Sequence, residues 1–142
     1  MKKSLTLIGI LVATLFFTTP VISMEGHGKN IHESKVNGTT LTYQLIDMTE
    51  NIKKMNDKNA AHQMTGTHHL MIMPKGGDDL SGAKVGFAVT DPDGKTHKAM
   101  AMGMGGGFGA DLPMMKNGKY TIKTKILKNK TRLDDEFIYH KH

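Results

Sequence analysis

Cysteine and tryptophan are absent from the 142-residue sequence, and aromatic residues make up only 6% of it. Without cysteine the chain forms no disulfide, so its stability has to come from a packed core. A blue-copper centre, a zinc site with cysteine ligands and a cysteine nucleophile are excluded as well, because each requires a thiolate. We also expect no nucleic-acid partner, since aromatic side chains for base stacking are few and the lysines are scattered through the predicted strands.

Motifs for catalysis are missing too. The sequence contains neither a Gly-x-Ser-x-Gly nucleophile elbow nor a His-Glu-x-x-His zinc motif. The neighbouring carboxylates at 134–136 fall in a predicted strand, where successive side chains point to opposite faces and do not form a pair. We therefore expect that the protein is not an enzyme.

The first 23 residues have the pattern of a secretory signal peptide. Lys2 and Lys3 form a short basic region, an apolar run follows at 5–17, and Ser23 offers a small residue at the cleavage position. The apolar run is shorter than the roughly 20 residues of a membrane-spanning helix, and no later run approaches that length. We therefore expect a periplasmic protein with one domain at 24–142, of which 24–33 is a flexible N-terminal segment.

Short segments of alternating apolar and polar residues follow one another along the rest of the chain. Asn37-Gly38 is the preferred dipeptide of a tight hairpin, and Asp91-Pro92-Asp93-Gly94 predicts a turn that pairs 83–90 with 95–104. The alternation predicts seven strands, at 31–36, 39–47, 67–73, 83–90, 95–104, 119–127 and 131–140. This spacing is typical of an all-β fold, an antiparallel sandwich of two sheets.

Glycine is concentrated at 105–110, where Gly-Gly-Gly-Phe-Gly-Ala formally fits a dinucleotide-binding fingerprint. That motif has to open a helix, and the following Asp111-Leu112-Pro113 does not favour one. We interpret the glycines instead as a sharp turn of the backbone between the two sheets.

Methionine is abundant, with 12 residues, and several of them recur with period two. In a strand this period places side chains on one face. One such row lies in the 95–104 strand and consists of Met100, Met102 and Met104. A similar row lies on one face of the 67–73 strand and consists of His69, Met71 and Met73, while His68, Leu70 and Ile72 share the other face. Met114 and Met115 form a third group after the glycines.

These rows point to a soft metal ion. Thioether sulfur stays neutral and suits Cu(I) best, with histidine as an added ligand. Alternate residues of one strand lie roughly 6.6 Å apart, so a single site needs ligands from two segments or a bend at Gly103 or Gly105. Our candidate metal ligands are Met100, Met102, Met104, His69, Met71, Met73 and Met114. The predicted function is a periplasmic metal-binding carrier or chaperone that holds Cu(I).

Methionine also fills irregular cores and adaptable binding surfaces, and other interpretations follow from this. Single methionines can belong to the core. As a group they can form a docking face for an envelope or membrane protein, in which case the protein is a metal-free accessory module. Replacing Met100, Met102 and Met104 by leucine separates the alternatives, because leucine keeps the apolar surface and removes the sulfur.

The order of the motifs resembles that of known exported domains, the YtkA-like and FixH-like domains. Five segments carry the resemblance, at 68–73, 85–95, 100–102, 108–110 and 118–122, within a region of about 67–127. The pattern is also similar to CopC-type periplasmic copper carriers and to copper-carrying accessory proteins of periplasmic iron uptake. The resemblance implies a seven- to eight-stranded antiparallel immunoglobulin-like (cupredoxin/CopC-like) β-sandwich and a copper site built from methionine and histidine.

Overall fold

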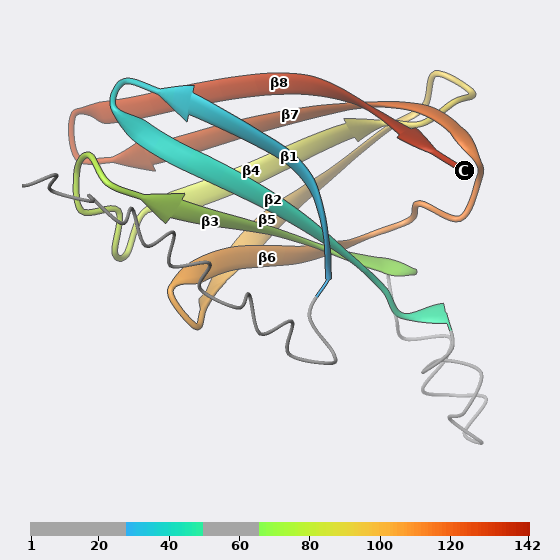
Figure 1. The fold of residues 1–142 in the computed structure, drawn as a ribbon, viewed down its shortest axis with the longest axis horizontal. Coiled ribbons are helices and arrows are strands. Elements are labelled where there is room, and N and C mark those ends of the chain that lie inside the picture. The colour runs from blue at the N-terminus through green and yellow to red at the C-terminus, as the bar shows by residue number, and fades with distance from the viewer. Residues whose placement is uncertain (1–27, 50–65) are drawn as a thin grey trace, which may run out of the picture.

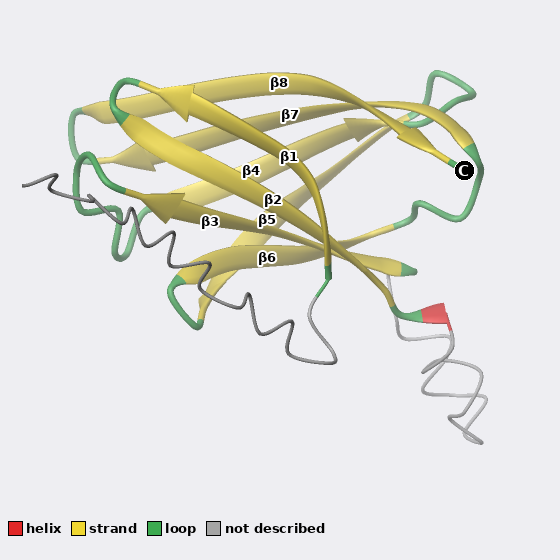
Figure 2. Cartoon of the chain, viewed as in Figure 1, coloured by secondary structure: helices red, strands yellow, loops and turns green. Residues whose placement is uncertain are grey.

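The computed structural model describes residues 28–49 and 66–142. The predicted signal peptide at 1–23 lies outside these ranges, as do residues 24–27 and 50–65. Strands and their connecting loops make up nearly all of the described chain (Figure 2). No helix among the described residues is long and apolar enough to cross a membrane.

Eight strands form the fold, one more than the alternation in the sequence predicts. They are β1 (Lys29–Val36), β2 (Thr39–Asp47), β3 (His68–Lys75), β4 (Lys84–Thr90), β5 (Thr96–Met104), β6 (Gly107–Leu112), β7 (Gly118–Lys128) and β8 (Thr131–Lys141). The seven predicted strands are all present, with ends that differ by at most two residues. The added strand is β6.

The strands follow the order β1-β2-β3-β6-β5-β4-β7-β8, and each neighbouring pair is antiparallel. β5 belongs to both halves of this sheet, because residues 96–101 pair with β4 and residues 102–104 pair with β6. The sheet curls until β1 lies beside β8 (Figure 1). The predicted all-β antiparallel sandwich is therefore confirmed, in a nearly closed form.

Turn chemistry explains the two predicted hairpins, which are both present. Asn37 and Gly38 adopt φ angles of 48° and 81°, the positive values that a two-residue turn between β1 and β2 needs. Between β4 and β5, the Asp91 carboxylate accepts hydrogen bonds from the backbone N–H groups of Asp93 and Lys95. Gly94 supplies the positive φ, at 84°.

The core lies between the two halves of the sheet and is formed by the inward-facing alternate residues. The predicted inner face of β2 is buried, and so are the inner faces of β3, β4 and β7. The largest side chains with under 2% exposure include Tyr43, Leu70, Ile72, Tyr120 and Ile122. Burial of this apolar surface is the main favourable term in folding, which a chain without disulfides requires.

The contact between β1 and β8 is made by side chains. In the part of the chain that the structure describes, no backbone ladder joins these two strands. Asp135 of β8 accepts hydrogen bonds from the hydroxyl of Ser34 on β1 and, at 2.8 Å, from the hydroxyl of Tyr43 on β2. His32 stacks on Phe137, with ring centroids 4.0 Å apart. Burial raises the pKa of Tyr43, so its hydroxyl remains protonated and donates to Asp135.

Two local predictions are wrong. The segment 24–33 is not flexible throughout, because β1 begins at Lys29, which pairs with Leu45 of β2. The glycine run is not only a turn. Gly105 and Gly106 make the turn, with φ angles of 53° and 84°, and the chain continues as β6. Glycine suits this strand because a Cβ on Gly107 would lie only 2.7 Å from the carbonyl oxygen of Ile72 on β3.

Candidate functional site

The two predicted methionine rows lie on the outer face of the sheet, on either side of β6. The order β3-β6-β5 separates the row of β3 from the row of β5 by one strand. Gly109 of β6 is opposite Met71 of β3 and also opposite Met102 of β5. Glycine has no side chain, so β6 places no side chain between these two methionines. We call His69, Met71 and Met102 the upper level of the cluster.

The imidazole of His69 lies above Gly109. A Cβ on Gly109 would overlap this ring, with the Cε1 atom 2.9 Å away. The Nδ1 atom of His69 lies 2.6 Å from Oδ1 of Asp111, the residue opposite it on β6. In a neutral imidazole this contact places the proton on Nδ1 and leaves the lone pair on Nε2, over Gly109. The Asp111 contact thus orients the imidazole with Nε2 over Gly109, at the upper level.

A second pair of methionines lies one step along the same strands. Met104 of β5 is opposite Gly107 of β6. Met73 of β3 reaches the same glycine from the other side, since a Cβ on Gly107 would lie 3.1 Å from its Cγ atom. We call Met73 and Met104 the lower level of the cluster.

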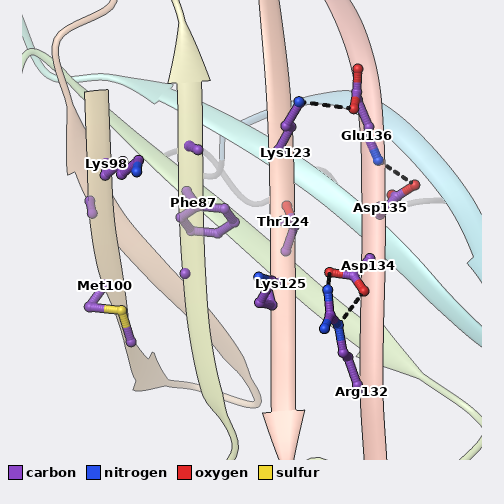
Figure 3. A pocket seen from close by; sticks show the side chains of 13 residues that line it. Phe87, Lys98, Met100, Lys123, Thr124, Lys125, Arg132, Asp134, Asp135 and Glu136 are labelled. Atoms are coloured by element: carbon purple, nitrogen blue, oxygen red, sulfur yellow. Dashed lines mark hydrogen bonds and ion pairs between the residues drawn. The ribbon is translucent and has the colours of Figure 1, made fainter. Parts of the chain in front are cut away.

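Met100 does not join either level. It pairs with Gly86 of β4, and its sulfur would lie 3.5 Å from a Cβ on that glycine. It lines an open groove of about 740 Å³ on the outer face of β4, β5, β7 and β8, whose other lining residues include Lys98 of β5 and Lys123 and Lys125 of β7 (Figure 3). The structure therefore places Met100 beside β4 and not beside β6, although it shares the outer face of β5 with Met102, because β5 changes its partner after residue 101.

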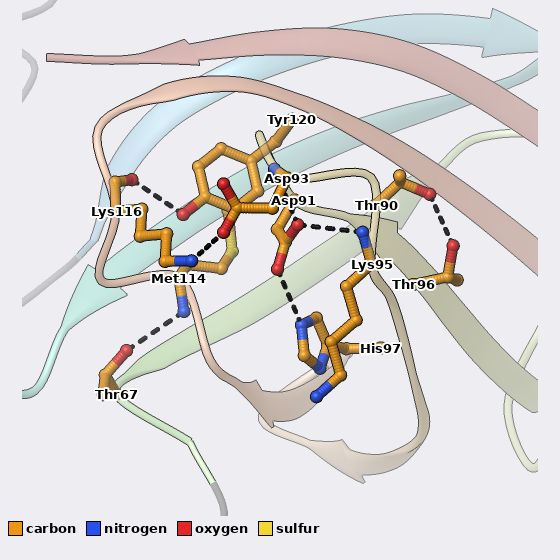
Figure 4. A network of polar contacts seen from close by, with 10 residues as sticks. All are labelled: Thr67, Thr90, Asp91, Asp93, Lys95, Thr96, His97, Met114, Lys116 and Tyr120. Carbon is orange, nitrogen blue, oxygen red and sulfur yellow. Dashed lines mark hydrogen bonds and ion pairs between the residues drawn. The ribbon is translucent and has the colours of Figure 1, made fainter.

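Met114 is also separate from the cluster. Its side chain is completely buried in the core, and its backbone N–H donates a hydrogen bond of 3.1 Å to the hydroxyl of Thr67. This contact belongs to a polar network that fixes the connection between β6 and β7 beside the β4–β5 turn, where Asp91 bonds to His97 (Figure 4). Met114 thus packs in the interior, whereas the adjacent Met115 is 60% exposed.

His68 faces inward, as the alternation of β3 predicts. It is 2% exposed, its Nδ1 atom lies 2.9 Å from the hydroxyl of Thr67, and its Nε2 atom lies 3.8 Å from Asp47. Burial lowers the pKa of His68, although the nearby Asp47 carboxylate opposes this effect. His68 is therefore a neutral histidine of the interior, on the face of β3 opposite to His69.

Asp111, Gly107 and Gly109 belong to the site but are not among the ligands predicted from the sequence. Their period-two spacing is the signal that could have identified 107–112 as a strand with these residues on one face. Within 28–49 and 66–142, no three histidine or carboxylate groups are arranged to hold a metal ion. A metal site on this part of the chain would therefore depend on thioether ligands.

No protein-family model matches the sequence, and a search of curated proteins gives no significant match. Solved structures do match. FetP of uropathogenic Escherichia coli, solved as isolated after expression in the periplasm of E. coli, has a TM-score of 0.56 over 84% of this chain and 97% of its own, at 16% identity. A copper-bound variant of FetP has a TM-score of 0.55 over 82% of this chain and 92% of its own, at 15% identity. A DUF4426 family protein of Pseudomonas aeruginosa has a TM-score of 0.53 over 78% of this chain and 94% of its own, at 13% identity.

These matches define the class of fold. The chain has an all-β sandwich similar to that of FetP, and the predicted likeness to periplasmic copper proteins is confirmed at the level of the fold. Identities of 13 to 16% show the fold alone. Membership of the YtkA-like or FixH-like domains stays a prediction.

Proposed function

We propose that the protein is a periplasmic carrier that binds Cu(I) as its cargo through His69, Met71 and Met102. The observation that carries the proposal is the arrangement about Gly109. Two methionines flank a residue without a side chain, and an imidazole nitrogen lies above it. One nitrogen and two thioether sulfurs form a soft ligand set of the kind that Cu(I) prefers.

Strand geometry is compatible with a single ion at this level. The Cα atoms of Met71 and Met102 are two strand spacings apart, about 9.6 Å. Two metal–sulfur bonds of about 2.3 Å each account for about 4.6 Å of this width, which leaves about 2.5 Å on each side for the methionine side chains to cover. Met104 cannot join the same ion easily, because it lies two residues farther along β5, roughly 6.8 Å away.

Asp111 would act on the ion through His69. A carboxylate bonded to Nδ1 fixes the tautomer and the orientation of a metal-binding imidazole and raises the basicity of the other nitrogen. The 2.6 Å contact between Asp111 and His69 has this geometry. Asp111 is therefore proposed as a positioning residue rather than a ligand.

Three observations support export and cargo transfer. The sequence predicts a signal peptide, and the structurally similar FetP was expressed in the periplasm, with one variant bound to copper. The Met102 side chain is 73% exposed, so an ion held there is accessible to an envelope or membrane protein that donates or receives it. We propose a carrier of this kind without enzymatic activity.

An anaerobic titration of Cu(I) against a chromogenic chelator tests the proposal. We expect the protein to compete with the chelator for Cu(I). The Met71→Leu/Met102→Leu double variant should lose high-affinity Cu(I) binding, because leucine preserves the volume of methionine but not its sulfur. The matched control is Met115→Leu, which removes an exposed thioether outside the cluster. Absence of competition, or equal affinity in the double variant, would refute the copper carrier.

The second candidate function is a metal-free accessory module. It is favoured by the exposure of Met100 and Met102, at 67% and 73%, which continues the apolar row from the cluster to the groove of β4 and β7. Replacement of both methionines by leucine separates the two functions. A docking face would still bind its partner, because leucine keeps the apolar surface, whereas a copper carrier would no longer transfer Cu(I). A protein that binds no copper and whose leucine variant still binds its partner would establish the accessory module.

A further inference from the structure

The lower level of the cluster has the same framework as the upper level but lacks its nitrogen ligand. Met104 is opposite Gly107 as Met102 is opposite Gly109, and Met73 approaches Gly107 from β3 through its Cγ atom, one residue beyond the last β3–β6 pair, Ile72 and Phe108. The two glycines are two residues apart on β6, so the levels are separated by roughly 6.8 Å. His69 and Asp111 both lie at the opposite end of the cluster, with Asp111 two residues beyond Gly109.

We propose that the lower level binds a second Cu(I) ion through the sulfur atoms of Met73 and Met104 alone. This inference rests on the proposed function of the upper level. Continued by one residue from the Ile72–Phe108 pair, the register places Met73 opposite Gly107, which gives the Cα atoms of Met73 and Met104 the same separation of two strand spacings, about 9.6 Å. Two thioethers on opposite sides of one ion form a neutral set that selects a soft monovalent ion.

Glycine at position 107 lets the Met73 side chain lie over β6. A Cβ on Gly107 would lie 2.7 Å from the carbonyl oxygen of Ile72 and 3.1 Å from Met73 Cγ, so any larger residue would displace the Met73 side chain. Met73 is half-buried and is anchored opposite Thr42 of β2, whereas Met104 is 39% exposed. One ligand is thus held by its neighbours and the other remains accessible from solvent.

The surroundings of Met104 favour a cation. Met104 and Gly107 line a groove of about 550 Å³ that also includes Asp78 and Asp79 of the β3–β4 loop. Asp79 is engaged by the Ser81 hydroxyl and its backbone N–H. Asp79 is also paired with Lys128, whose Nζ lies 3.8 Å from its carboxylate, so the negative potential beside Met104 comes mainly from Asp78. Neither carboxylate groups with other histidine or carboxylate ligands of the described chain to hold a metal ion.

The stoichiometry of binding separates the two levels. In the anaerobic titration we expect two equivalents of Cu(I) for the full protein, the second bound more weakly because it has no imidazole ligand. The Met73→Leu/Met104→Leu variant should retain one tight equivalent, and the Met71→Leu/Met102→Leu variant should retain one weak equivalent. Met115→Leu is again the control and should bind two. Circular dichroism of each variant verifies that the fold is kept.

X-ray absorption at the copper edge gives an independent readout. Addition of the second equivalent should add sulfur neighbours at about 2.3 Å and no further nitrogen. A single tight equivalent that is unchanged in Met73→Leu/Met104→Leu would overturn the lower level and leave the proposed function intact. A single equivalent weakened by both double variants would show one ion shared by four methionines, which also overturns it. No binding by the full protein would refute the proposed function itself.

Discussion

Replacement of Tyr43 by phenylalanine tests whether hydrogen bonds to Asp135 close the sandwich. Tyr43 is completely buried, and its hydroxyl lies 2.8 Å from Oδ2 of Asp135. Hydrogen bonds to charged groups contribute about 1.5–3 kcal/mol to stability, but Asp135 is half-buried, so water replaces part of the loss and we expect the free energy of unfolding to fall by about 1–2 kcal/mol. Phenylalanine keeps the ring packed on Phe137, whose centroid is 4.6 Å away.

Unfolding in urea and by heat, followed by circular dichroism, measures this loss. The expected decrease in Tm is roughly 4–8 °C for a domain of this size. Tyr139→Phe is the matched control, since it removes the same hydroxyl from a half-buried tyrosine of β8 for which the described chain offers no hydrogen-bond partner. Its effect should stay within about 0.5 kcal/mol.

A double-mutant cycle with Ser34→Ala extends the test. Ser34 and Tyr43 donate to the same oxygen of Asp135, so we expect their effects to be coupled and not additive. If Tyr43→Phe costs no more than Tyr139→Phe, the hydroxyl contact does not stabilise the closure, and the reasoning is refuted.

Further predictions concern His68, Asp111 and Ile72. Because burial lowers the pKa of His68 from about 6.5, the unfolded chain binds a proton that the folded chain excludes, so the metal-free protein should lose stability below pH 6.5, by at most about 1.4 kcal/mol per pH unit. Urea unfolding at pH 7.5 and 5.5 measures this, and the same slope in His68→Gln would contradict it. Asp111→Asn should weaken Cu(I) binding about 10–100-fold without changing the number of ions, and equal affinity in the competition titration would remove Asp111 from its positioning role. Ile72→Ala, at a fully buried site, should cost about 2–5 kcal/mol in urea unfolding, and a loss below about 1 kcal/mol would show a site that collapses around the deletion.

Most of the fold could be predicted from the sequence because the relevant patterns are local. The alternation in 39–47 identifies β2 and its buried face, and Asn37-Gly38 fixes the hairpin with β1. β6 could not be predicted in the same way, because Gly107 and Gly109 have low strand propensity. They adopt a strand only since β3 and β5 pair with them on both sides. Pairing with neighbouring strands, and not local propensity, therefore makes 107–112 a strand.

The candidate site could be predicted only in part, for a related reason. Period two shows which residues share a face, and it correctly groups His69 with Met71 and Met73. It does not show which strands are neighbours. The separation of Met100 from Met102 depends on the change of partner within β5, and the contact of His69 with Asp111 depends on the register with β6.

The contact between β1 and β8 also has a consequence for folding kinetics. Ser34 and Asp135 are 101 residues apart, so the chain entropy lost on joining them is large, whereas the β1–β2 and β7–β8 hairpins close short loops. We therefore expect these hairpins to form early and the contact between the first and last strands to form last. Substitutions at this contact should accelerate unfolding more than they slow folding. Amide hydrogens of β1 should accordingly exchange with solvent through local opening, while those of β4 and β7 stay protected until the whole domain unfolds.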